Sequence, residues 1–190
     1  MRAFIAIELP QKIKDKLARF QMRLKKSGAD VKWVAPENIH LTLKFLGEIA
    51  EEKSAKIFQI IEEITDRNKQ LQLRLAAVGV FPKIEFPRVI WLAIDKGDNE
   101  VKILAKTLEE EIAKLGIPKE NRPFSSHITI GRIRSALNRD KLIKILKESE
   151  NYFAKEKFEF SVTRITLFKS TLGPSGPVYA PLKATNINTA

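Results

Sequence analysis

Short apolar runs and amphipathic segments alternate along the whole chain of 190 residues. Residues 3–7 and 90–94 are apolar runs with β-branched side chains, and an acidic residue follows each run, which is typical of a short buried strand. Apolar residues at intervals of three and four predict amphipathic helices, two of which end at a glycine, a common helix stop. The four expected helices cover residues 13–28, 51–67, 98–116 and 138–149.

The second half of the chain repeats this pattern at an offset of 87 residues. The matched strand-like segments are 2–8 with 89–95 and 71–75 with 158–162, and the helices follow in equivalent places. An accidental overlay of generic strand and helix patterns is the alternative. Five matched elements at a single offset favour a duplicated unit, about residues 1–87 and 88–190, packed as one domain of two lobes with an approximate twofold.

The two histidines of the chain occupy the same tetrapeptide frame, in which an apolar residue, a threonine and a second apolar residue follow. His40 and His127 head these frames. Side chains two residues apart on a strand share a face, so Thr42 is expected beside His40 and Thr129 beside His127. A lone histidine on a strand is more often a surface or core residue, and threonine is an ordinary strand residue. Two matched frames favour a paired function instead.

This set of side chains suits the cleavage of a phosphodiester. If a twofold relates the two halves, both His–Thr pairs face one central cleft. One neutral imidazole can then take a proton from an attacking water or hydroxyl, while the other gives a proton to the leaving oxygen. The threonine hydroxyls can donate hydrogen bonds to phosphate oxygens. Two histidines without a third ligand make a poor metal site, so we expect neither a metal nor a cofactor.

Composition and charge narrow the class of partner. Lys and Arg outnumber Asp and Glu by 34 to 23, and the net charge of +11 favours a nucleic acid or nucleotide. A thermophile-like surface rich in Lys and Glu is the alternative. The chain has no cysteine, which excludes disulfides and cysteine nucleophiles. No apolar run approaches the roughly 20 residues that span a membrane, and the first ten residues read as a strand, so we expect a cytoplasmic protein, by default a monomer.

The chain resembles the two-histidine (2H) phosphoesterase superfamily, and within it the RNA 2′,3′-cyclic phosphodiesterases, also called 2′-5′ RNA ligases. The similarity is carried by residues 2–10, 38–47, 79–82, 87–91, 122–132, 168–172 and 176–179. One histidine frame is weak evidence, whereas two frames with these flanks are specific. One departure is visible: many relatives have proline before the second histidine, where this chain has Ser126, which leaves the loop freer or adds a hydroxyl near His127.

The resemblance implies an α+β fold of two lobes, each an antiparallel sheet flanked by helices, around a central cleft. It implies metal-free hydrolysis of RNA 2′,3′-cyclic phosphate ends, or of nucleoside 2′,3′-cyclic phosphates, to 2′-phosphomonoesters. In this reaction His40 would be the proton donor and His127 the proton acceptor. Two alternatives stay open: a 2′-5′ RNA ligase that joins tRNA fragments, and a non-catalytic module that binds RNA ends.

Basic residues near the two frames are candidates for substrate binding. Arg132 matches a basic residue of the family and could hold a phosphate with two hydrogen bonds. Strand alternation, however, turns Arg132 away from the face of His127 unless the strand bends. Arg122 and Lys44 are similar candidates, and solvated charge is the alternative for both.

Aromatic residues form a second group of candidates. Phe45 and Phe81 could stack on a base, with core packing as the alternative. Arg88 and Tyr179 also match the family, and for these two we expect a structural role.

Overall fold

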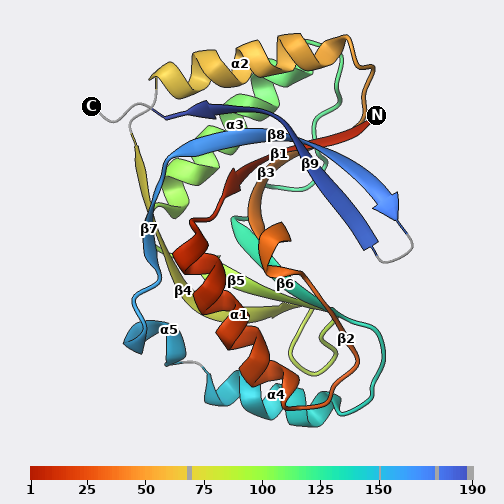
Figure 1. The fold of residues 1–190 in the computed structure, drawn as a ribbon, viewed down its shortest axis with the longest axis vertical. Helices are drawn as coiled ribbons and strands as arrows, with labels where there is room; N and C mark the ends of the chain where they lie inside the picture. Colours follow the sequence, from red (N-terminus) through yellow and green to blue (C-terminus); the bar gives the residue numbers. More distant parts are fainter. Residues whose placement is uncertain (68–69, 150, 174–175, 188–190) are drawn as a thin grey trace.

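The strands of the protein form two antiparallel sheets (Figure 1). The computed structural model describes residues 1–67, 70–149, 151–173 and 176–187. The first sheet has the order β3-β1-β8-β9 and the second has the order β2-β6-β5-β4-β7. The strands are β1 (Arg2–Glu8), β2 (Val31–Trp33), β3 (His40–Glu48), β4 (Leu71–Phe81), β5 (Val89–Ile94), β6 (His127–Ile133), β7 (Glu159–Val162), β8 (Arg164–Gly173) and β9 (Gly176–Asn186).

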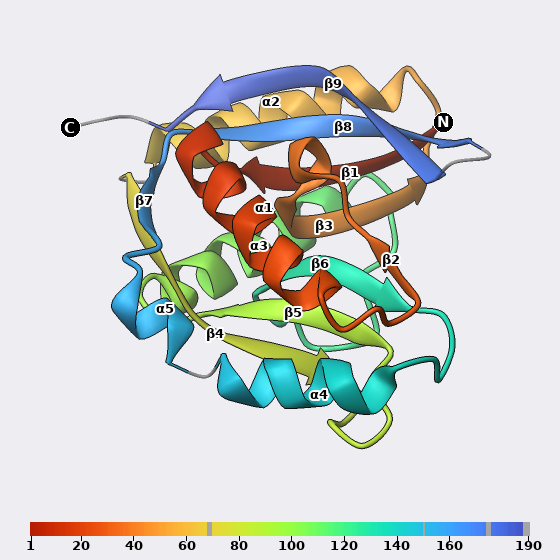
Figure 2. The same ribbon diagram turned by 60° about the horizontal axis from the view of Figure 1, so that its bottom comes forward.

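Helices cover the outer sides of the sheets (Figures 1 and 2). They are α1 (Gln11–Lys25), α2 (Lys53–Arg67), α3 (Asp98–Ala113), α4 (Arg139–Glu148) and the short α5 (Tyr152–Lys155), with one 3-10 turn, η1 (Pro36–Asn38). The four expected helices are therefore confirmed, with ends that differ by a few residues. None of the described helices is long and apolar enough to cross a membrane.

Each lobe takes elements from both halves of the chain. Helices α2 and α3 pack together against the first sheet, although α3 follows a strand of the second. Helix α1 follows β1 of the first sheet but lies against the second, where the amide of Gln21 donates to the carbonyl of Ile130 at 2.9 Å. In the same way, β4 comes from the first half of the chain but belongs to the second sheet, and β8 comes from the second half but belongs to the first sheet. The expected α+β fold with two antiparallel sheets is confirmed, but its lobes are not the two halves of the sequence.

Within the second sheet, β4 pairs with the edge strand β7, which leads directly into β8 of the first sheet. Leu71 lies opposite Val162, and the amide of Leu75 donates to the carbonyl of Phe158 at 3.0 Å. The 87-residue offset matches Leu71 with Phe158 and Leu75 with Val162, so each segment pairs with its own counterpart in reverse order. A twofold axis produces this reciprocal pairing. It supports the predicted duplication within a single domain, which stays a prediction.

One face of the first sheet is packed as core. Ile5, Ile7, Leu41 and Leu167 are fully buried on this face, against α2 and α3. The opposite face carries the alternate residues of the same strands, beginning with His40. The alternation of β1 and β3 therefore presents the histidine frame on the inner side of the lobe.

Candidate active site

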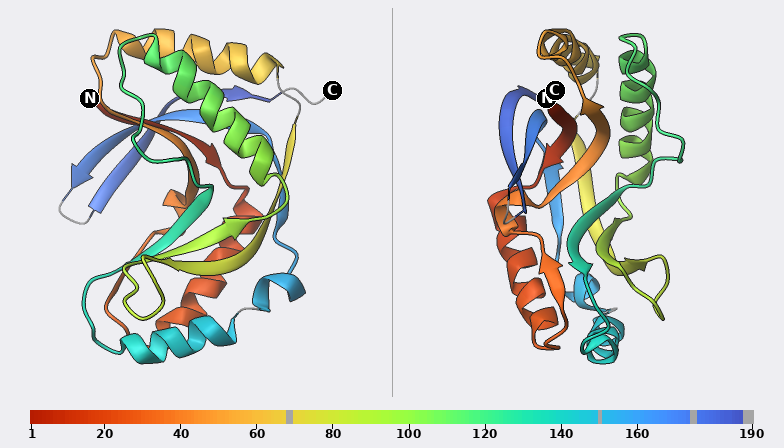
Figure 3. Two further views of the ribbon diagram at one scale, coloured as in Figure 1. Left: turned by 180° about the vertical axis from the view of Figure 1, so that it is seen from behind. Right: turned by 90° about the vertical axis from the view of Figure 1, so that its right-hand side faces the viewer.

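Both histidines are the first residues of their strands. His40 opens β3, the outer strand of the first sheet, and His127 opens β6 in the second sheet. Strands β3 and β6 lie next to each other at the junction of the two sheets, and the sheets diverge from this junction (Figure 3). The fold thus brings the two predicted frames, 87 residues apart in sequence, onto neighbouring strands.

The two imidazoles are held in the same way. Nδ1 of His40 lies 2.7 Å from the carbonyl oxygen of Asn38, and Nδ1 of His127 lies 2.8 Å from that of Ser125. Because a carbonyl oxygen can only accept, Nδ1 carries the hydrogen in both rings. The atom that can gain or lose a proton is therefore Nε2 in both cases.

The threonines differ in their contacts. The hydroxyl of Thr42 lies 3.0 Å from Nε2 of His40, so it can donate to the neutral imidazole. Thr129 is half-buried beside His127 on the same face of β6, opposite Trp91. Both threonines share a face with their histidine, as strand alternation predicts.

A bulge in each strand decides which later residues join the histidine face. In β3, Lys44 pairs with Ile5 and Thr42 with Ala6, so Leu43 is the extra residue. In β6 the same irregularity falls at Ile130, the residue that the 87-residue offset matches with Leu43. An extra residue reverses the alternation of everything beyond it.

The bulges bring Phe45 and Arg132 to the histidine side. Gly131 and Lys44, which follow the extra residues, are both buried, and the next residue of each strand is exposed. A Cβ atom on Gly131 would come within 2.9 Å of Val31, so this inward position suits glycine. Arg132 thus lies on the face of His127 because the strand bends, and Phe45 lies on the face of His40.

Aromatic rings surround His40. The ring of Phe4 stacks on His40 with a centroid distance of 4.9 Å and on Phe168 at 5.2 Å. Tyr179 meets the imidazole edge-on at 5.3 Å. Phe45 is 57% exposed and its ring lies 6.3 Å from Phe4, so it is available to a ligand rather than packed in the core.

A matching aromatic pair lies beside His127. Phe81 stacks on Trp91 at 4.7 Å, and both rings meet the imidazole at steep angles. A Cβ atom on Gly79 would lie 2.6 Å from the Trp91 ring, so glycine lets the indole lie flat on the strand. The offset matches Phe4 with Trp91 and Phe168 with Phe81. This correspondence could have identified Phe4, Trp91 and Phe168 from the sequence, which we did not predict as part of the site.

Burial and neighbouring charges together set the pKa of His40. Burial lowers the pKa of His40 below its usual value, because the charged imidazolium loses contact with water. The hydrogen bond to Asn38 raises this pKa, the charge of Lys14 lowers it, and that of Glu8 raises it, with a net lowering. Glu8 itself is held by Thr166 at 2.6 Å and Arg164 at 2.9 Å.

Arg132 shares a strand face with His127 and is also close to Tyr179, a residue that contacts His40. Burial raises the pKa of the Tyr179 phenol, whereas the positive charges of Arg132 and Arg2 lower it, with a net rise. Arg132 is therefore close enough to act on a residue that contacts His40. Tyr179, for which we expected a structural role, lies against the imidazole itself.

The other predicted basic residues lie elsewhere. The bulge turns Lys44 inward, where its Nζ lies 2.7 Å from the carboxylate of Glu109 and its side chain is fully buried. Lys44, which we expected either to bind substrate or to be a solvated charge, is therefore turned away from the histidines and paired in the core. Arg122 is exposed in the loop between α3 and β6.

Ser126 adds an anchor to the entry of β6. Its buried hydroxyl donates to the carboxylate of Asp98, the first residue of α3. Burial raises the pKa of Asp98, but hydrogen bonds from Lys102 and Ser126 outweigh this effect, so the pKa is lowered and the carboxylate stays charged. Of the two consequences expected for serine at this position, the structure supports the added hydroxyl.

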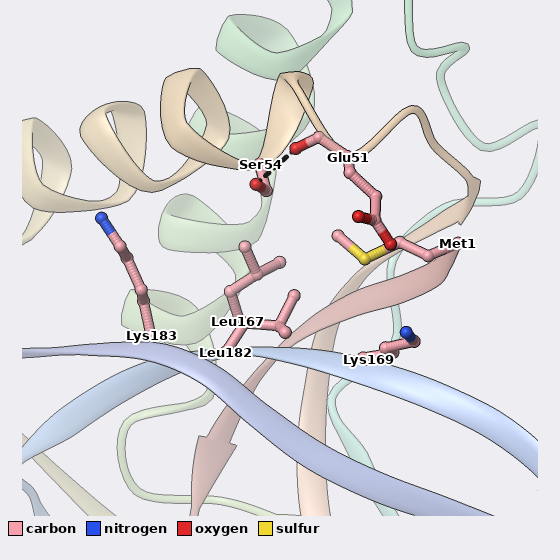
Figure 4. A pocket seen from close by; sticks show the side chains of 7 residues that line it. All are labelled: Met1, Glu51, Ser54, Leu167, Lys169, Leu182 and Lys183. Carbon is pink, nitrogen blue, oxygen red and sulfur yellow. Dashed lines mark hydrogen bonds between the residues drawn. The ribbon is translucent and has the colours of Figure 1, made fainter.

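Two pockets in the described part of the chain lie away from the histidines. One pocket is on the opposite side of the first sheet, between α2 and strands β8 and β9, and Leu167, Lys183 and Ser54 contribute to it (Figure 4). A second lies beside Gln72 and Gly97. Neither includes His40 or His127, so the predicted central cleft stays a prediction. Within the described residues, no three His, Asp or Glu side chains are grouped as metal ligands.

Comparison with known proteins places the chain in a family. The sequence profile of the family described as "LigT like Phosphoesterase" matches residues 7–91 and 93–179. The chain belongs to the LigT-like phosphoesterases. The expected 2H phosphoesterase resemblance is thereby confirmed, and the matched ranges contain both histidine frames.

Individual LigT-like proteins agree over nearly the full chain. A Methanocaldococcus jannaschii protein named RNA 2′,3′-cyclic phosphodiesterase is 38% identical, covering 96% of this chain and 99% of its own length. A Methanothermobacter thermautotrophicus protein of the same name is 33% identical, covering 96% and 97%. The crystal structure of Escherichia coli LigT complexed with 3′-AMP has a TM-score of 0.76 and 27% identity, covering 99% and 98%.

Proposed function

We propose that this protein hydrolyses 2′,3′-cyclic phosphates at RNA ends to 2′-phosphomonoesters. The observation that carries the proposal is the matched pair of imidazoles on neighbouring strands, each with Nδ1 on a backbone carbonyl, which leaves Nε2 as the nitrogen that exchanges a proton. The name of the two archaeal relatives and the 3′-AMP bound to E. coli LigT support a ribonucleotide substrate.

In the proposed reaction one proton is taken and one is given. Nε2 of His127 takes a proton from a water molecule, whose oxygen forms the new bond to phosphorus. The bond between phosphorus and the 3′ oxygen breaks, and Nε2 of His40 gives its proton to that oxygen. Thr42, Thr129 and the Arg132 guanidinium donate hydrogen bonds to the non-bridging oxygens, where negative charge develops.

The test is turnover of a nucleoside 2′,3′-cyclic phosphate in EDTA, with the product identified by phosphorus NMR. We expect a 2′-phosphomonoester. A 3′-phosphomonoester, a requirement for a divalent metal, or binding without turnover contradicts the proposal. Adding an RNA with a 5′-hydroxyl end measures 2′-5′ joining in the same assay, because a hydroxyl then replaces water as the attacking group.

Glu8→Gln tests the proton-donor role of His40. Loss of the Glu8 charge removes a factor that raises the pKa of His40, so this pKa falls further. Above about pH 8, beyond the ordinary histidine pKa of about 6.5, the fraction of protonated His40 falls with its pKa. If His40 is the donor, kcat/KM of Glu8→Gln is lower than wild type on this alkaline side. If His40 is the base, the alkaline side is unchanged and activity at acidic pH rises.

Arg132→Ala tests whether this side chain binds the phosphate. We expect KM for the cyclic phosphate to rise by about tenfold to a hundredfold, since a charge-assisted hydrogen bond contributes about 1.5–3 kcal/mol. Arg132→Lys should recover part of the loss, because it restores the charge without the two-pronged geometry. An unchanged KM in Arg132→Ala would show that the arginine only faces solvent.

A further inference from the structure

A cluster of basic residues around one exposed aromatic ring lies beside the site, on the side of His127. It is formed by the loop between β4 and β5 and by the segment after β6. We call it the Phe86 surface: Lys83 and Arg139 lie against the Phe86 ring, and the exposed Arg88 and Arg134 belong to the same two segments. We infer that the preferred substrate is an RNA strand, whose nucleotides on the 5′ side of the cyclic phosphate lie across the Phe86 surface. This inference rests on the proposed function.

Phe86 has the geometry of a stacking platform. Its side chain is 57% exposed, although it is a large apolar ring. The Nζ of Lys83 lies 5.5 Å from the ring centroid and the guanidinium carbon of Arg139 lies 5.3 Å from it. An exposed ring with cations beside it can stack on a base while the cations meet the adjoining phosphates.

Arg139 has unused capacity to donate hydrogen bonds. Its Nε is buried and has no hydrogen-bond partner in the part of the chain that the structure describes. Buried donors are normally paired, so an unpaired one next to an exposed aromatic ring is notable. Because Nε is shielded from solvent, a phosphate oxygen would accept from the terminal nitrogens of this guanidinium.

The Phe86 surface is continuous with the site. The amide of Arg88 donates to the carbonyl of Phe81 at 2.7 Å, and Phe81 contacts the His127 ring. The carbonyl of Arg88 accepts from the amide of Ile133 at 2.9 Å, next to Arg132. Backbone hydrogen bonds therefore fix the loop between β4 and β5 against the end of β6. The Phe86 surface thus adjoins the face of β6 that carries His127 and Arg132.

The charge of the segment that follows the His127 frame differs from that of the equivalent segment after the His40 frame. The segment after the His127 frame, residues 132–141, has four basic side chains and one acidic one. The segment after the His40 frame, residues 45–54, has three acidic side chains and one basic one. A polyanion is attracted to the first and repelled by the second. The loop of Phe86 does contain one acidic residue, Glu85, which is outnumbered by its basic neighbours.

The experiment compares a cyclic mononucleotide with an oligoribonucleotide of about eight residues that ends in the same 2′,3′-cyclic nucleotide, a length within the usual span of a single-strand site. Phe86→Ala should lower kcat/KM for the oligoribonucleotide about fivefold or more, because base stacking is lost. The mononucleotide should be unaffected, and Phe86→Trp should keep the wild-type value. Arg19→Ala, at an exposed position of α1, is the matched control for loss of surface charge.

Binding is measured in parallel by fluorescence anisotropy with a labelled oligoribonucleotide that carries a 2′-phosphate end. Arg139→Ala should weaken binding and reduce the slope of log K against log salt by about 0.7, the value for one phosphate contact on a single strand. Binding that depends on Phe86 without any turnover would reject the proposed function and keep this inference. Equal effects of Phe86→Ala on both substrates, or no effect on either, would overturn the inference while turnover upholds the proposed function.

Discussion

His40→Ala and His127→Ala are each expected to lower kcat for a 2′,3′-cyclic phosphate by about 100-fold to 10,000-fold. That range is the usual contribution of one positioned acid or base to a proton-transfer step. The two imidazoles are held alike through Nδ1, so each offers Nε2 to a different proton of one reaction. The double variant should lose much less than the product of the two single losses, because both groups act in the same transition state.

Controls separate loss of chemistry from loss of fold. His40→Gln and His127→Gln keep a polar side chain of similar reach but cannot exchange a proton, and should be as inactive as the alanine variants. Added imidazole should restore part of the activity of His127→Ala and less of that of His40→Ala, because His40 is packed among Phe4 and Tyr179. Retention of a tenth of the activity or more by a folded single variant would contradict the two-histidine mechanism.

The parts of the site that the sequence predicts are those with a local pattern. His40 and Thr42 share a face, as do His127 and Thr129, because the period of a strand is two residues. The bulges are not visible in this pattern, since both positions of each bulge are compatible with a buried strand residue. Regular alternation would turn Arg132 away from His127, and the bulge at Ile130 is the bend that brings it to the same face.

The parts of the fold that the sequence does not predict depend on pairing between strands that are far apart in the chain. Strand β8 reaches the first sheet by pairing with β1, where Ala3 lies opposite Lys169, a residue 166 positions later in the chain, and no local periodicity reports such a contact. Strand β2 has three residues and is too short for a periodic pattern. Strand β9 contains Pro177 and Pro181, which argue against a strand; it is tolerated here because β9 is the edge of its sheet.

Lys44→Met is expected to lower the free energy of unfolding by about 2–3 kcal/mol while leaving kcat/KM of the folded protein within about twofold of wild type. Loss of one partner of a buried ion pair costs about 3–5 kcal/mol, because the remaining charge is left without compensation. The loss expected here, about 2–3 kcal/mol, is below this range because the side chain of Glu109 is 22% exposed and water can reach it. Urea denaturation with an unchanged m-value measures the difference.

Lys44→Met combined with Glu109→Gln should recover part of this loss, since the neutral amide no longer needs a cation. The carboxylate of Glu109 also accepts from the amide of Glu120 at 2.5 Å, an interaction that the amide oxygen of glutamine can keep. The pair therefore ties β3 to α3 and to the loop that leads to β6, on the core side of the strand. A raised KM for the cyclic phosphate in the single variant, with unchanged stability, would instead return Lys44 to the substrate-binding role that its sequence position predicted.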